Sequence, residues 1–118
     1  MEKKDLNRLE HILDAAKAIQ EHIKEKKQSD LDKNRLLLGG IIRELLVIGE
    51  AANAISSQMK AQIPLPWKEV IGMRNQLVHA YFEINHKIIW MTVTEDIPKL
   101  TAELENFLRK RFYNSCEN

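Results

Sequence analysis

The apolar residues between positions 36 and 55 are the feature that most restricts how this chain can fold. They are not confined to one stripe and lie nearly all round a helix, at Leu36, Leu37, Leu38, Ile41, Ile42, Leu45, Leu46, Val47, Ile48, Ala51, Ala52 and Ile55. A helix that is apolar on nearly every side is buried by neighbours on several sides. We therefore expect a central helix from about Leu31 or Asp32 to Lys60, packed on the other helices and also on another subunit.

Three glycines lie inside this predicted central helix, at positions 39, 40 and 49. In a helix interior each glycine costs up to about 1 kcal/mol relative to alanine. Close approach of another helix backbone would offset that cost. A hinge at Gly39 and Gly40 is the alternative interpretation.

The segments on either side of the central helix also have helical periodicity. Residues 5–27 carry an apolar stripe with steps of three and four, and Asp5 is a plausible N-cap. Pro64 and Pro66 end the central helix, because proline lacks the N–H group and disfavours a helical residue before it. A short helix from Trp67 leads into the helix that holds the motif described below, and a last helix spans about residues 86–113 with a kink at Pro98. The pattern predicts an all-α, up-and-down bundle of about four to five helices.

Length and charge limit the classes of function. The 118 residues suit one domain, 1–118, with one hydrophobic core. A net charge of +1 does not indicate a nucleic-acid binder, so any RNA-binding surface must come from local clusters of Lys and Arg. The single cysteine, the absence of an apolar signal core and the absence of a run of about 18 apolar residues lead us to expect a cytoplasmic protein that is neither secreted nor membrane-spanning.

Residues 72–83, with the sequence GMRNQLVHAYFE, contain the side chains that could take part in a chemical reaction. Arg74 and His79 are five positions apart, Asn75 follows the arginine, and Tyr81 lies two positions after the histidine. Arginine offers a fork of donors that suits phosphate oxygens, and histidine transfers protons near neutral pH. Both groups are needed to cleave RNA. No group of His, Cys and Asp has the spacing of a metal site, so we expect no metal and no cofactor.

Helix geometry leaves the arrangement of this motif open. If residues 73–81 are helical, Arg74 and Tyr81 share a face, whereas His79 lies roughly 140° round from Arg74. His79 then joins them only if the helix frays or bends near Ala80, or if a second copy of the chain completes the site. Periodicity alone favours a structural role for Arg74 and His79, as a buried ion pair or a polar contact that ties helices together.

Glu50 is a carboxylate inside an apolar run, Val-Ile-Gly-Glu-Ala-Ala. If it is buried, it needs a partner, and Arg74 is the attractive candidate. The alternative is that Glu50 lies on a polar strip beside Arg43 and is solvated.

The motif resembles the R-x4-H-x-Y signature of the HepT-like HEPN ribonuclease toxins. The likeness extends from about residue 5 to 112 through landmarks that are similar in order and spacing: 48–56 (IGEAANAIS), 63–67 (IPLPW), 71–75 (IGMRN), Trp90 and 96–100 (DIPKL). The resemblance implies a HEPN-like homodimer with its active site near the two-fold axis. It also implies a metal-independent endoribonuclease toxin that leaves a 2′,3′-cyclic phosphate.

The resemblance assigns a role to each motif residue. Arg74 and His79 would be catalytic, Asn75 and Glu50 supporting, and Tyr81 the residue to which an MntA-type nucleotidyltransferase antitoxin transfers AMP. Two alternatives remain: Tyr81 can be a core residue with a satisfied hydroxyl, and the chain can be a non-catalytic helical module that binds RNA or a protein partner.

Overall fold

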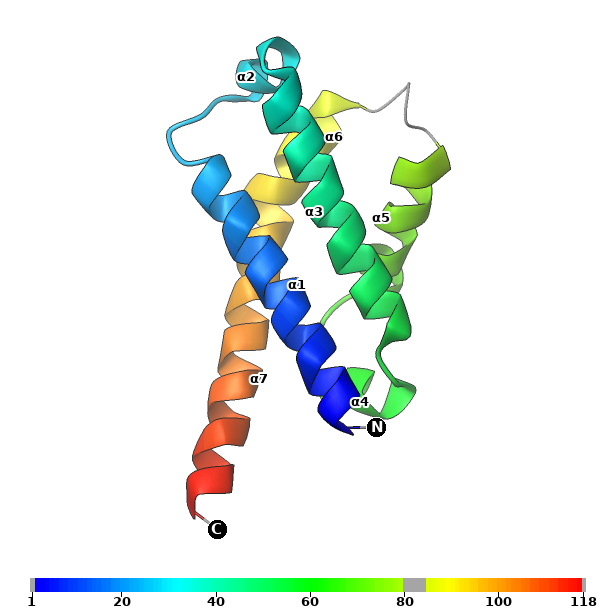
Figure 1. Cartoon of the computed structure of the whole chain (residues 1–118), viewed down its shortest axis with the longest axis vertical. Helices are drawn as coiled ribbons and strands as arrows, with labels where there is room; N and C mark the ends of the chain where they lie inside the picture. The colour runs from blue at the N-terminus through cyan, green and yellow to red at the C-terminus, as the bar shows by residue number, and fades with distance from the viewer. Residues whose placement is uncertain (1, 80–84, 118) are drawn as a thin grey trace.

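The computed structural model describes the backbone of residues 2–79 and 85–117 and the side chains of residues 2–77 and 85–112. Its elements, in chain order, are α1 (Glu2–His22), α2 (Gln28–Lys33), α3 (Arg35–Ala54), α4 (Ser57–Lys60), α5 (Trp67–His79), α6 (His86–Met91), a π-helical turn η2 (Thr92–Asp96) and α7 (Ile97–Glu117). The long helices alternate in direction, so both ends of the chain lie at the same end of the bundle (Figure 1). The predicted all-α bundle is confirmed, and the described residues contain no strand.

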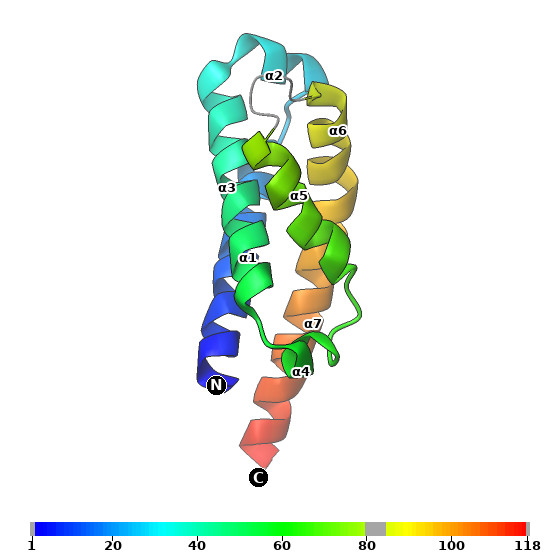
Figure 2. The ribbon, with the colours of Figure 1, turned by 90° about the vertical axis from the view of Figure 1, so that its right-hand side faces the viewer.

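Helix α3 is the central element of the bundle. It packs on α1 along one side and on α5 along another, while α7 lies against α1. Figure 2 shows α5 alongside α3, with the α6–η2–α7 run on the far side of α5. The core is built from aliphatic side chains that are almost completely inaccessible to solvent, including Leu9, Ile12, Ile19, Ile41, Leu45, Ile48, Val93 and Leu104. Each such side chain stabilises the fold by about 1.5–3 kcal/mol.

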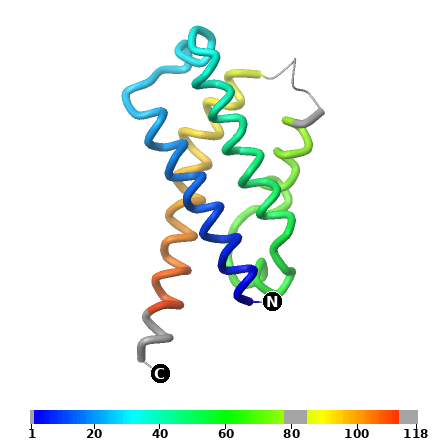
Figure 3. The backbone as a smooth tube through the Cα atoms, viewed as in Figure 1, coloured from blue at the N-terminus to red at the C-terminus, as the bar shows by residue number. Residues whose placement is uncertain are grey.

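The predicted central helix is interrupted at both ends by polar caps. The Oδ1 atom of Asn34 accepts a hydrogen bond of 3.0 Å from Leu37 N, which starts α3 afresh after the short α2. The Ser56 Oγ atom accepts a hydrogen bond of 3.2 Å from Met59 N and starts α4 in the same way. Periodicity predicted one helix because the apolar pattern continues across both caps. Figure 3 traces the chain turning at these two places.

The hinge considered at Gly39 and Gly40 is wrong, because α3 runs through both residues without a break. An added Cβ atom at either position would meet no atom within 4 Å. Close helix approach is therefore found at Gly49 and not at these two glycines.

The prediction that Asp5 is an N-cap of the first helix is wrong. Helix α1 begins at Glu2, and Asp5 lies inside it with only 4% of its surface exposed. Its carboxylate accepts hydrogen bonds from Ser56 N (3.0 Å) and Ser56 Oγ (2.6 Å). The neighbouring Arg8 Nη1 donates to Ala54 O at 3.0 Å. Helix α1 is thereby tied to the junction between α3 and α4, a tertiary role that local capping rules do not reveal.

The last predicted helix contains a π-helical turn before the expected kink. Pro98 has no N–H group with which to bond the preceding turn, and the wider turn η2 lies directly before it. The N–H group of Ile97, the residue after η2, donates to Thr92 O, five residues earlier in the chain. At the start of this run, His86 Nδ1 contacts the carboxylate of Asp32 on α2.

Replacing Asp5 with Asn is expected to lower the melting temperature by several degrees at neutral pH. The hydrogen bonds from the Ser56 hydroxyl and then from the Ser56 backbone hold the pKa of the Asp5 carboxyl below its ordinary value. A lowered folded-state pKa stabilises the fold above the unfolded-state pKa, and this contribution is lost as the pH falls through the folded-state pKa. Thermal unfolding followed by circular dichroism at several pH values should therefore give a difference that shrinks in acid.

Asp14→Asn is the matched control, because Asp14 is an exposed carboxylate on the same helix. It should leave the melting temperature nearly unchanged. Equal losses for the two variants would contradict the role of Asp5.

Candidate active site

The candidate site forms where α5 crosses α3 at Gly49. A Cβ atom built on this glycine would lie 2.4 Å from Arg74 Cβ and 3.4 Å from Arg74 Cα. Real side chains do not approach so closely, so only glycine allows the two helices this separation. The crossing brings the motif arginine directly over the helix that carries Glu50.

Arg74 is held by two side chains. Its Nε and Nη2 atoms both donate to Glu50 Oε1, at 3.2 and 3.0 Å, and its Nη1 atom donates to Asn75 Oδ1 at 3.2 Å. Guanidinium groups have five N–H donors in a rigid plane, so three contacts fix the orientation of that plane. The contact between Glu50 and Arg74 that the sequence left open is therefore present.

The pair lies at the surface. The Glu50 side chain is 62% exposed and the Arg74 side chain 36% exposed, so Glu50 is paired but not buried. Exposed ion pairs contribute little to stability because water screens both charges. The contact is better suited to orienting the guanidinium than to holding the fold together. Arg43 points away from this pair and lies 3.4 Å from Glu44 Oε1.

The two remaining motif residues are described only in part or not at all. His79 is the last residue of α5, five residues after Arg74, and the rise of about 1.5 Å per residue puts it roughly 7.5 Å further along the axis. Its side chain lies outside the described residues, and so does the whole of Tyr81. The predicted shared face of Arg74 and Tyr81 stays a prediction. Leu77, three residues after Arg74 on α5, is 7% exposed and belongs to the core.

Sequence reasoning did not identify which glycine would serve the site. It proposed close approach for three glycines, but only Gly49 adjoins another helix, and its neighbour is the motif arginine. The sequence feature that could have identified it is that Gly49 directly precedes Glu50. A residue without a side chain next to the carboxylate lets a second helix come close enough to contact that carboxylate.

The described residues contain no group of three or more His, Cys, Asp or Glu side chains close enough together to hold a metal ion. Of the helices they form, none combines the length and the apolar character that crossing a membrane requires.

Together the fold and the site define a small all-α bundle with an exposed arginine fixed on a helix that ends at a histidine. The family described as "Ribonuclease HepT-like" matches residues 12–107. This chain belongs to that family, and its bundle is of the HEPN-like type expected from the sequence.

Similar proteins from archaea and bacteria cover nearly the same length. A protein of Thermococcus cleftensis, provisionally named ribonuclease HepT, is 37% identical over 111 residues, which are 93% of this chain and 100% of the relative. A protein of Methanocaldococcus jannaschii is 36% identical over 107 residues, 89% of this chain and 98% of its own. One of Caldanaerobacter subterraneus is 36% identical over 103 residues, 86% of this chain and 92% of its own. The last two are provisionally named as RNases. No solved structure gave a significant match.

Replacing Gly49 with Ala is expected to lower the free energy of unfolding by about 1–3 kcal/mol, the usual cost of overpacking. The new methyl group meets the Cβ atom of Arg74, which is anchored to the backbone and cannot rotate away, so α3 and α5 must separate. Urea unfolding measures the change.

Gly72→Ala is the matched control. A Cβ atom at Gly72, two residues before Arg74 on α5, would meet no atom within 4 Å. Helix propensity then favours alanine by up to about 1 kcal/mol, so this variant should be slightly more stable. If both variants raised, or both lowered, the free energy of unfolding, the close approach at Gly49 would be contradicted.

Proposed function

We propose that this protein is a cytoplasmic, metal-independent endoribonuclease toxin of a toxin–antitoxin system, with Arg74 and His79 as its catalytic residues. The observation that carries the proposal is the oriented, solvent-accessible Arg74 guanidinium on the same helix as His79, in a chain of the ribonuclease HepT-like family. The relatives that are named as ribonucleases cover most of this chain and support the same activity.

Arg74 has donors left for a phosphate. Glu50 and Asn75 take three of the five guanidinium N–H groups, and the other two have no partner among the described residues. These two N–H groups can donate hydrogen bonds to two oxygens of the scissile phosphate, one to each. Their positive charge stabilises the extra negative charge of the transition state. Asn75 and Glu50 support this by holding the guanidinium, and the Asn75 amide can also orient the phosphate.

The cleavage itself is an internal transesterification of RNA. The 2′ oxygen attacks the phosphorus, its proton passes to a base, the bond from phosphorus to the 5′ oxygen breaks, and that oxygen takes a proton. The products are a 2′,3′-cyclic phosphate and a free 5′ hydroxyl. His79 serves as the base or the acid, since imidazole exchanges protons near neutral pH.

A homodimer would supply the second proton-transfer group. The motif of one chain contains one histidine, whereas transesterification uses both a base and an acid. Two copies with their motif helices near a two-fold axis would bring two such histidines to one RNA strand.

Replacing His79 with Ala should lower cleavage of total tRNA and mRNA in EDTA by about 10²- to 10⁴-fold, the usual contribution of general acid–base catalysis. Gel electrophoresis of the products gives the rate. His11→Ala is the matched control, because His11 is an exposed histidine on α1, away from the motif. Cleavage by the parent and by His11→Ala, but not by His79→Ala, is the expected result.

Retained cleavage by His79→Ala would exclude the catalytic role. If no variant and no parent protein cleaves RNA, yet RNA is still bound, the chain is a non-catalytic binding module whose motif is structural.

The same proposal includes a partner, a nucleotidyltransferase antitoxin of the MntA type that transfers AMP to Tyr81. The added phosphates are anionic and bulky, so they would repel and exclude RNA from the site. Co-expression with a candidate partner should add AMP masses to the parent chain and none to Tyr81→Phe, by intact-protein mass spectrometry. Tyr113→Phe, the other tyrosine of the chain, should be modified as the parent is. AMP mapped by peptide sequencing to any residue other than Tyr81 would overturn the assignment.

A further inference from the structure

Basic side chains gather where the first turn of α1 and the last turns of α7 meet. Both lie at the same end of the bundle (Figure 1), and Glu2 of α1 contacts Arg111 of α7. Four exposed basic side chains lie next to this pair in the chain: Lys3, Lys4, Arg109 and Lys110. We call these four residues the terminal basic cluster.

The cluster has an excess of positive charge in a nearly neutral chain. Together with Arg111 it carries a charge of +5, and Glu2 reduces this to +4, whereas the whole chain has a net charge of +1, which leaves −3 for all other residues. The ion pairs found among the described residues include none of the four cluster residues. The positive charge of this surface is therefore available to an anionic partner.

Helix electrostatics do not account for Arg109 and Lys110. Positive side chains interact favourably with the helix dipole only within the last turn of a helix. Helix α7 continues to Glu117, so Lys110 lies roughly two turns before its end. The two basic residues therefore gain little from the dipole of their own helix.

At the start of α1, the positions of Lys3 and Lys4 are unfavourable. The first turn of a helix has unpaired N–H groups and attracts negative charge, so lysines there weaken the helix. Helix α1 begins at Glu2, which puts both lysines in that first turn. Binding of an anion from outside the chain would offset this cost.

An exposed aromatic side chain lies beside the cluster. Phe112 is 72% exposed, and it follows Arg109 by three residues, so the two side chains are neighbours on the surface of α7. Single-stranded nucleic acids are bound by positive groups that contact phosphates and by aromatic rings on which bases stack. The cluster and Phe112 supply both.

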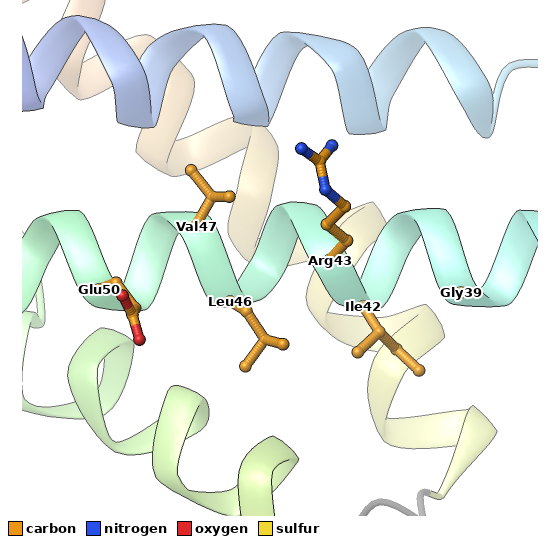
Figure 4. A pocket seen from close by; sticks show the side chains of 6 residues that line it. All are labelled: Gly39, Ile42, Arg43, Leu46, Val47 and Glu50. Atoms are coloured by element: carbon orange, nitrogen blue, oxygen red, sulfur yellow. The ribbon is translucent and has the colours of Figure 1, made fainter.

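The open face of α3 does not offer this combination. It carries a shallow groove of about 390 Å³, lined by Gly39, Ile42, Arg43, Leu46, Val47 and Glu50 (Figure 4). The single arginine of this lining is matched by a single carboxylate, so the groove has no net charge. Phosphates beyond the candidate site are better matched by the terminal basic cluster.

We propose that the terminal basic cluster and Phe112 form a second RNA-binding surface, which holds the strand at a distance from the scissile phosphate bound by Arg74. The inference rests on the proposed function for the identity of its ligand. The positive charges contact phosphates without regard to sequence, and Phe112 stacks on one base.

The fold places this surface within reach of the site. Asp5, the residue after Lys4, accepts a hydrogen bond of 3.0 Å from Ser56 N, just beyond the end of α3 at Ala54. Ala54 lies five residues after Gly49, which is roughly 7.5 Å along the helix axis. A strand of several nucleotides can therefore contact both Arg74 and the cluster, whereas a dinucleotide bound at Arg74 cannot.

The salt dependence of RNA binding tests the phosphate contacts. Chains that carry His79→Ala, to prevent cleavage, are titrated into a fluorescein-labelled single-stranded RNA, and fluorescence anisotropy gives the affinity. Adding Lys3→Gln, Lys4→Gln, Arg109→Gln and Lys110→Gln together should weaken binding on the order of a hundredfold at about 0.1 M salt. The slope of log K against log salt should fall in magnitude by about three, since each lost contact with a single strand removes about 0.7. Circular dichroism checks that the variant is folded.

Two further variants separate charge from stacking. Phe112→Ala should weaken binding about tenfold, a typical loss for one stacked base, and leave the salt slope unchanged. Lys24→Gln combined with Lys26→Gln is the matched control, because these exposed lysines lie just after α1, at the opposite end of this helix, next to acidic residues in the chain. The control should leave both the affinity and the slope nearly unchanged.

Cleavage kinetics distinguish this surface from the active site. In chains that retain His79, the four substitutions of the cluster should raise KM for a long RNA and leave kcat unchanged, because these residues do not touch the scissile phosphate. Cleavage of a dinucleotide should be the same as in the parent.

RNA binding that keeps its affinity and salt slope without the cluster would overturn the proposal and leave the ribonuclease activity intact. Cluster-dependent binding to phosphatidylserine vesicles, with unchanged RNA binding, would overturn it in favour of a membrane surface. Slower cleavage of the dinucleotide would place the cluster in the active site instead. A parent that binds RNA through the cluster but cleaves neither substrate would contradict the proposed function and support this surface, and a parent that binds no RNA would overturn both.

Discussion

The close approach of α5 to α3 at Gly49 is the contact on which the candidate site depends. Without a Cβ atom on Gly49, the backbone of α5 lies near enough for Arg74 to reach back to Glu50, the next residue of α3. The same crossing buries Leu77 of α5 and Ile48 of α3 in the core. Packing and chemistry therefore share one geometry: the apolar sides of both helices set the distance between them, and the polar sides meet at the surface where that distance is smallest. Surface ion pairs are weak, so the hydrophobic core, and not the salt bridge, holds the arginine in place.

Most of the fold could be predicted because apolar periodicity is a property of each helix separately. The all-round apolar pattern of residues 36–55 correctly indicated the central helix, but that helix ends at Ala54, before the prolines that were expected to end it. What the pattern could not give was the interruptions at Asn34 and Ser56, since caps of one or two residues do not disturb the repeat. Asp5 is a second case in which the local sequence does not reveal the role of a residue. Its sequence position suits a local cap, yet its carboxylate bonds Ser56, fifty-one residues away, and only the packing of α1 decides between the two roles.

The sequence predicted which residues belong to the candidate site better than it predicted how they are arranged. The spacing of the motif selected Arg74 and Asn75, and the apolar surroundings of Glu50 suggested that it needs a partner. That partner is Arg74, but the reason given was incomplete, because Glu50 is exposed and its pairing is set by the helix crossing and not by burial. The relation of His79 and Tyr81 to Arg74 depends on the path of the chain after α5. Sequence spacing does not determine that path, since residues 80–84 lie between two helices of different direction.

Helix α3 meets two demands that are usually in conflict. A central helix is normally covered on all sides, and the sequence of α3 is apolar enough for that, but α1 and α5 leave one face open. Leu36 and Val47 on that face carry a cost in water that only a covering surface removes. The cover cannot be purely apolar, because Arg43 and Glu50 belong to the same face and each needs an opposite charge once water is excluded. Since Glu50 is also the residue that orients Arg74, any surface that covers this face acts on the site.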